Sequence, residues 1–155
     1  MIELFAAEPR VGVLQASRRL GVARGTVQAR LDRLQRTGVV SGWGPQLDPA
    51  SLDHPVTAFL TLEIRQASAA SGALQGGHDA VGAHLATIPE LLEACTITGP
   101  GDILCRVVAR SNTDLQRVID RVLAHDGIVR CSTVIALETQ VPHRVLPLLG
   151  SVVAD

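Results

Sequence analysis

Residues 24–36 carry the side-chain types that read and hold duplex DNA. Arginine reaches guanine edges or phosphates, while threonine and glutamine hydrogen-bond to bases. Small residues near the start of a helix let its backbone come close to base edges. The candidate DNA-contacting residues are Arg24, Gly25, Thr26, Gln28, Ala29, Arg30, Arg33 and Arg36. Their types and spacing predict a surface for contact with double-stranded DNA.

Two short helices must position this surface. Val27, Leu31 and Leu34 follow the i, i+4, i+7 spacing of one side of a helix. The side opposite this stripe carries Gly25, Ala29, Asp32 and Arg36. The preceding helix has its own stripe at Val13, Ala16 and Leu20. Gly21 allows a sharp turn between the helices because glycine enters the left-handed region freely. This pattern predicts a helix-turn-helix, whose second helix enters the major groove.

An amphipathic hairpin of a helical bundle is the alternative interpretation, and the charge distribution favours DNA. Residues 1–36 contain seven arginines and three acidic residues, a net charge of +4. The remaining chain has seven arginines and twelve acidic residues, a net charge of −5. The overall charge of −1 therefore hides a basic N-terminal part, which phosphate contact requires. A patch this small suggests binding by two copies of the chain.

Composition bounds the class of protein. The 155 residues are 46% hydrophobic and 19% charged, which is typical of a folded protein with a well-formed core. Aromatic residues make up 2%, too few for binding single strands by base stacking. No apolar run is long enough for a membrane span, and no signal pattern opens the chain, so we expect no membrane partner and a cytoplasmic location. Three cysteines in apolar runs predict reduced, buried thiols.

The pattern along the chain divides it into residues 1–54 and 55–155. The first part holds a short helix over residues 2–7, the helix-turn-helix and a glycine-interrupted strand over residues 39–47, either a wing or a connecting strand. A turn-rich stretch closes it near His54. We therefore expect a winged-helix-like DNA-binding domain with a connecting strand.

The second part alternates strands and helices. We expect strands over residues 56–65, 91–99, 103–110 and 129–141, a loop over residues 66–77, a helix capped by Asp79 that runs to about Ile88, and a helix opened by Ser111 in a capping box. The order strand, helix, strand, strand, helix, strand predicts a ferredoxin-like βαββαβ domain in an α+β protein. Phe59 lies on the strand face opposite the core stripe, so the sheet should pack against a further surface.

The combined pattern resembles the Lrp/AsnC, or feast/famine, transcriptional regulators over nearly the whole chain. The most specific match is the turn Thr98-Gly99-Pro100-Gly101-Asp102, and the segments at residues 21–49, 88–108 and 127–139 are also similar. The resemblance implies a transcriptional regulator whose second domain binds a small effector and pairs its sheet face to face in a homodimer. Such dimers often assemble into tetramers or octamers, with an amino acid held between subunits near the turn.

The resemblance also implies an effector site. The residues that would form it are Thr98, Gly99, Pro100, Gly101, Asp102, Cys131 and Thr133. Backbone amides of the glycine-rich turn would hold a carboxylate, and Asp102 would pair with an ammonium group. The alternative is a plain hairpin in which Asp102 bonds to its own turn. Ala23 and Cys131 replace a serine and a threonine that are common in the family, so a helix cap and one effector hydroxyl are missing here.

Enzyme motifs are absent from the sequence. The five histidines show no metal-ligand spacing, and no nucleotide-binding or nucleophile motif is present, so we expect no metal, no cofactor and no catalytic residue. Two alternatives remain: a tetrapyrrole decarboxylase of the same architecture, and an effector-binding adaptor that does not bind DNA. The acidic second part argues against the decarboxylase, which would need basic side chains around its pocket.

Overall fold

The computed structural model describes residues 1–65 and 74–152, and contacts divide them into two compact units. One unit contains residues 1–46 together with the described part of 141–155, and the other contains residues 47–140. None of the described helices has the length and apolar character needed to span a bilayer. Each unit is described by itself.

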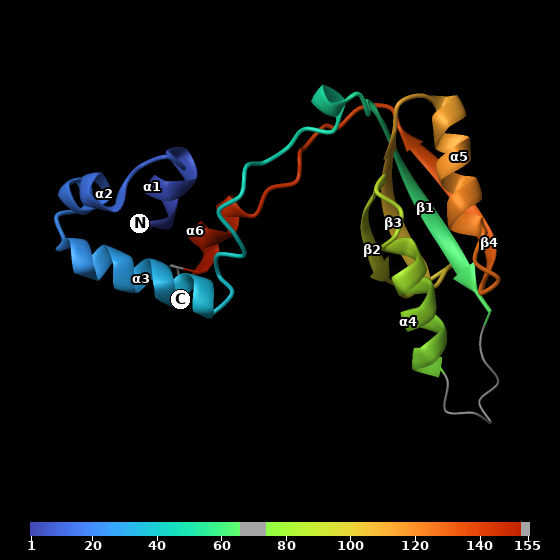
Figure 1. Cartoon of the computed structure of the whole chain (residues 1–155), viewed down its shortest axis with the longest axis horizontal. Helices are drawn as coiled ribbons and strands as arrows, with labels where there is room; N and C mark the ends of the chain where they lie inside the picture. The colour runs from blue at the N-terminus through green and yellow to red at the C-terminus, as the bar shows by residue number, and fades with distance from the viewer. Residues whose placement is uncertain (66–73, 153–155) are drawn as a thin grey trace. The chain divides into compact units, whose positions relative to one another are not determined.

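The first unit is built from three helices around a small core. They are α1 (Ile2–Ala7), α2 (Val13–Leu20) and α3 (Arg24–Arg36) (Figure 1). Phe5, Ala16, Val27 and Leu31 are buried together. Gly21 adopts φ 65°, the left-handed conformation that ends α2, and its amide donates to the carbonyl of Ser17. The predicted helix-turn-helix is therefore confirmed.

The predicted strand over residues 39–47 does not form. The chain from Gly38 to Asp48 has no strand pairing, so the described residues contain neither a wing nor a connecting strand. Two glycines and Pro45 weaken a ladder here, and Pro45 cannot donate a hydrogen bond to one. Trp43 instead packs edge-to-face against Phe5, with ring centroids 5.7 Å apart. The segment is thus attached to the helices by an aromatic contact.

The C-terminal segment returns to the first unit. The last strand ends at Ala136, five residues before the predicted end at Val141, and η3 (Leu146–Leu148) and α6 (Leu149–Val152) follow it. Ala136 pairs with Thr57, the second residue of β1, so β1 offers almost no further partner for a longer final strand. Residues after 140 therefore accompany the helices and not the sheet.

The second unit is a four-stranded antiparallel sheet with two helices, which confirms the α+β class and the βαββαβ order. Its elements are β1 (Val56–Ile64), α4 (Leu74–Leu85), β2 (Leu91–Thr96), β3 (Ile103–Ala109), α5 (Asn112–Leu123) and β4 (Ile128–Ala136), preceded by η1 (Ala50–Leu52). The strand order is β2-β3-β1-β4 (Figure 1). The two central strands, β3 and β1, therefore come from the two halves of the motif.

Both helices cover the same face of this sheet. Alternate residues of β1, including Leu60 and Leu62, are fully buried against Val81 of α4 and against Val118 and Val122 of α5. The period of two in β1 and the 3.6-residue period in α5 explain why these residues face one another. The other face of the sheet is left without a covering helix among the described residues.

The helix predicted to begin at Asp79 begins earlier. The structure has α4 from Leu74, so Asp79 is an internal, exposed helix residue and not its cap. Residues 74–77 lack an apolar period, so the sequence pattern predicts a loop there. The rest of that predicted loop, residues 66–73, lies outside the described residues.

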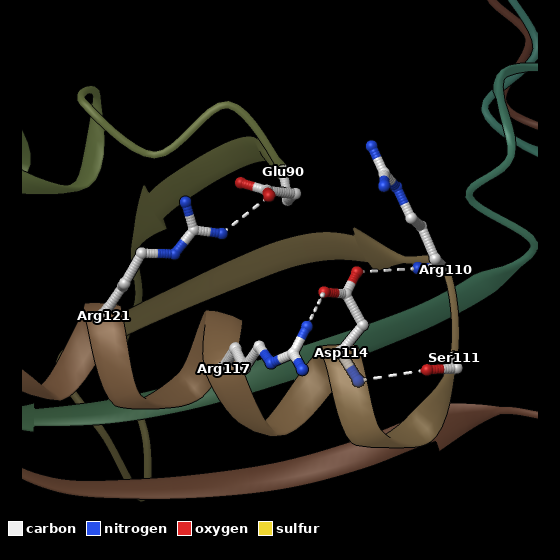
Figure 2. A network of polar contacts seen from close by, with 6 residues as sticks. All are labelled: Glu90, Arg110, Ser111, Asp114, Arg117 and Arg121. Atoms are coloured by element: carbon white, nitrogen blue, oxygen red, sulfur yellow. Dashed lines mark hydrogen bonds and ion pairs between the residues drawn. The ribbon is translucent and has the colours of Figure 1, made fainter.

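A polar network fixes the start of α5 (Figure 2). Ser111 caps the helix, because its Oγ accepts a hydrogen bond from the Asp114 amide at 3.1 Å. The Asp114 carboxylate in turn accepts from the amide of Arg110 at 3.0 Å, one residue before the cap. Further along, Arg121 contacts Glu90 at 2.6 Å and so connects α5 to the loop before β2. The predicted capping arrangement is therefore present in a slightly shifted form.

Candidate nucleic-acid interface and effector turn

The sides of α3 away from its buried stripe carry every predicted DNA-contacting residue. Val27 and Leu31 are buried, whereas all eight candidates are exposed: Arg24, Gly25, Thr26, Gln28, Ala29, Arg30, Arg33 and Arg36. The arrangement brings four guanidinium groups and two hydrogen-bonding side chains onto one helix. Such a surface can contact phosphates and base edges together.

The two flanks of α3 differ chemically. On one flank, the Gln28 amide donates to the Asp32 carboxylate at 2.9 Å, which orients both side chains along the helix. On the other flank, Arg30 and Arg33 line an open groove of about 950 Å³, whose wall includes Leu149 of α6. The neutral and acidic flank suits hydrogen bonds to bases, whereas the basic flank suits phosphates.

The start of α3 has no side-chain cap. Ala23 occupies the capping position with an extended backbone, φ −61° and ψ 147°. Its carbonyl accepts hydrogen bonds from the amides of Thr26 at 3.0 Å and Val27 at 3.2 Å. The side chain of Ala23 offers no acceptor, so the amides of Gly25 and Thr26 lack the hydrogen bond that a serine hydroxyl would supply.

Within the described part of this unit, the ion pairing leaves the arginines of α3 without an acidic partner. Glu8, one of its three acidic residues before Arg36, contacts Arg19 at the end of α2. Arg24, Arg30, Arg33 and Arg36 form no ion pair among the described residues. The cations of α3 are therefore available to a polyanion.

The predicted effector turn connects β2 to β3 and packs against the end of β1. The amide of Asp102 donates to the Leu62 carbonyl at 2.8 Å, and its carboxylate accepts from the Ile64 amide at 2.8 Å. A Cβ on Gly101 would lie 2.4 Å from the Thr61 methyl group, so only glycine fits there. Gly99 has φ 121°, which also favours glycine. The turn is thus held in two ways: by its own hairpin bond, in which the Ile97 amide donates to the Asp102 carbonyl at 2.9 Å, and by the two hydrogen bonds between Asp102 and β1.

The structure does not place the other two predicted effector residues beside this turn. Cys131 and Thr133 lie on β4, opposite Leu62 and Leu60 of β1, and their nearest polar atoms are 3.8 Å apart. Neighbouring strands are about 4.8 Å apart, so two strand spacings separate β4 from β3. Burial raises the pKa of the half-buried Cys131 thiol. Within one chain the predicted effector residues therefore form two separate groups: the turn at residues 98–102, and Cys131 with Thr133 on β4.

The uncovered face of the sheet is apolar at its centre. Phe59 lies opposite Val134 of β4. Leu104 of β3 lies on the same face, opposite Thr61, which is two residues after Phe59. The side chains of Phe59, Val134 and Leu104 are 39%, 65% and 37% exposed. Phe59 was predicted from its alternation along β1. Leu104 and Val134 were missed, because only the observed register shows which alternate residues of β3 and β4 share its face.

These features together define a class. A helix-turn-helix with a basic outward surface, joined to a ferredoxin-like unit, is the architecture of a transcriptional regulator with a separate ligand-binding domain. Residues 57–146 match the family model described as the Lrp/AsnC ligand binding domain, and residues 1–41 match a winged helix-turn-helix DNA-binding model. The chain belongs to the Lrp/AsnC family and is an effector-responsive DNA-binding transcriptional regulator.

Similar proteins cover nearly the full chain. The regulatory protein AsnC of Escherichia coli is 25% identical over 148 residues, 95% of this chain and 92% of AsnC. The HTH-type transcriptional regulator FL11 of Pyrococcus furiosus is 23% identical over 96% of this chain and 92% of its own. A Neisseria meningitidis transcriptional regulator solved with L-Met has a TM-score of 0.80 at 22% identity, over 96% of this chain and 92% of that one.

Proposed function

We propose that this chain regulates transcription in the cytoplasm as a homodimer, assembling further to a tetramer or octamer, and that an amino acid changes its assembly or its hold on DNA. The observation that carries this proposal is α3, because its buried stripe leaves all eight candidate DNA-contacting residues exposed. The relatives AsnC and FL11 described above are both named as regulators, which supports the proposal.

Two copies would supply the affinity that one helix lacks. Arg30 and Arg33 would hold phosphates, while Thr26, Gln28 and the small residues Gly25 and Ala29 would approach base edges in the major groove. Two α3 helices of a symmetric dimer would read half-sites about 34 Å apart, or a multiple of that spacing.

The uncovered sheet face supports self-association. Exposed apolar side chains at its centre favour burial against a complementary surface, and a two-fold dimer uses the same patch on both copies. Phe59, Leu104 and Val134 would form the centre of that interface. Cys131 and Thr133, which lie opposite Leu62 and Leu60 on the helix-covered face, stay outside this interface, so only a contact between dimers in a larger assembly could bring them to a turn.

The effector would bind near the turn at residues 98–102, with Cys131 and Thr133 contributing from a subunit of a neighbouring dimer in the tetramer or octamer. The Neisseria meningitidis protein in complex with L-Met supports an amino acid as the ligand class. Such a ligand can shift the assembly only if it binds two arrangements of the subunits unequally.

Retardation of the adjacent intergenic DNA, with and without each amino acid, tests the proposal. We expect salt-sensitive binding that one amino acid changes, with light scattering reporting a parallel change in assembly size. If the chain retards no DNA at any salt concentration, the proposed regulator is contradicted and the adaptor is favoured. A coloured, tetrapyrrole-bound preparation would favour the decarboxylase.

Asp102 needs a pair of variants because its carboxylate also holds β1. Asp102→Asn keeps an oxygen that can accept from the Ile64 amide but removes the charge, whereas Asp102→Ala removes both. Calorimetric titration should show weak amino-acid binding by both variants if Asp102 pairs with an ammonium group. Normal affinity in Asp102→Asn would exclude that role.

A further inference from the structure

The uncovered face of the sheet has a cation near its apolar centre. Arg106 of β3 lies opposite Phe59 of β1 in the register, and Phe59 lies opposite Val134. Arg106 is half-buried, and its Nε is buried without a hydrogen-bond partner among residues 1–65 and 74–152. A polar atom in that state indicates an unfinished interaction, because buried polar groups normally have partners.

The chain's own acidic residues do not complete that interaction. Glu93 of β2 lies opposite Arg106, but the Cys95 thiol is the group that donates to its carboxylate, at 3.8 Å. Among the described residues Arg106 forms no ion pair, whereas Arg130 on the same face pairs with Glu63 at 3.4 Å. The two arginines of this face therefore differ in whether they already have a partner.

A second copy stacked on this face would bury Arg106 further, which is unfavourable for an unpaired cation. If the symmetry axis ran across the strands, β3 would lie over β3 of the second copy. Arg106 would then face the same arginine or Leu104. If the axis ran along the strands between β3 and β1, each β3 would lie over the other copy's β1. Arg106 would then face Phe59.

We propose that Arg106 packs on the ring of Phe59 of the partner subunit, twice per dimer, and so sets the orientation in which the two sheets stack. This inference rests on the homodimer proposed above. Sheets packed face to face lie about 10 Å apart, a gap that side chains from both sides fill. A guanidinium over an aromatic face is attracted by the ring, more strongly once water is excluded. Arg106 is thus a specificity-determining residue of self-association.

Mixing two variants separates a contact between subunits from one within a chain. Arg106→Met keeps an apolar side chain of similar length, and Phe59→Leu removes the ring. A dimer of either variant lacks both proposed contacts, but a heterodimer of the two retains one. Native mass spectrometry of the mixture, at a concentration where each variant dimerises alone, should show a heterodimer excess of roughly three- to tenfold over the statistical ratio.

Arg130→Met provides the matched control, since it makes the same substitution on the same face at an arginine paired with Glu63. Its mixture with Phe59→Leu should give the statistical ratio. A statistical ratio for the Arg106→Met mixture, or an equal excess in the control, would overturn the assignment of Arg106 while leaving the homodimer intact. A wild-type chain that is monomeric in solution would instead overturn the homodimer and this contact together.

Discussion

Ala23→Ser should stabilise the start of α3. The backbone at this position already has the extended geometry of a helix cap, and only an acceptor side chain is missing. Serine Oγ can accept from the amide of Gly25 or Thr26. Caps of this type contribute about 1 kcal/mol, which corresponds to roughly a fivefold change in an opening equilibrium. Amide hydrogen exchange at Gly25 and Thr26, followed by NMR, should slow by about that factor.

Ala29→Ser is the matched control for this cap. Ala29 is exposed in the middle of α3, where serine adds no cap and lowers helix propensity by up to about 0.7 kcal/mol. Exchange in α3 should therefore become slightly faster in this variant. If both substitutions change exchange in the same direction, or Ala23→Ser changes nothing, the first turn of α3 does not lack a cap as described.

Three further predictions concern charge and thiol chemistry. Arg33→Ala should weaken DNA retardation and reduce the slope of log affinity against log salt by about 0.9 per chain that contacts DNA; an unchanged slope would exclude a phosphate contact. Burial raises the pKa of Glu90, but the hydrogen bond and charge of Arg121 outweigh burial, so the pKa lies below its ordinary value of 4.5 in the folded chain. That carboxylate therefore stabilises the fold above pH 4.5 and loses its effect as pH falls through the lowered pKa. Chemical denaturation of Glu90→Gln should show a deficit at pH 7 that shrinks below pH 4, and a constant deficit would contradict the assignment. Burial raises the pKa of Cys105 to about 12, so maleimide at pH 7 should spare Cys105 in the folded chain and modify it only after unfolding, which peptide mapping would show.

Periodicity was sufficient to predict the elements that have a buried side. The spacing of Val27 and Leu31 predicts α3, and the alternation through Leu60 and Leu62 predicts β1. Both predictions succeed because burial imposes a period on the residues that face a core. The start of α4 had no such signal. Its first four residues, Leu74 to Gly77, include two glycines and have no apolar period, so the sequence pattern does not predict a helix there.

For the candidate sites, too, the sequence predicts the residues that follow a periodic pattern and misses those that depend on contacts between distant segments. The outward residues of α3 follow directly from its stripe. The position of Arg106 beside Phe59 depends on strand register, and the contact of Trp43 with Phe5 depends on how an irregular segment folds back. The hydrogen bond of Asp102 to the end of β1 likewise joins residues 38 positions apart. Sequence spacing carries no direct information about contacts of that kind.

The return of the C-terminal segment to the helical unit has a mechanical consequence. Because residues 1–46 and the described part of 141–155 share one unit, the sheet unit is inserted in the chain and joined to the helices by two covalent connections. A single connection would act as a swivel, free to rotate. With two connections, a full turn of one unit against the other winds the connections around each other, which limits how far either unit can rotate.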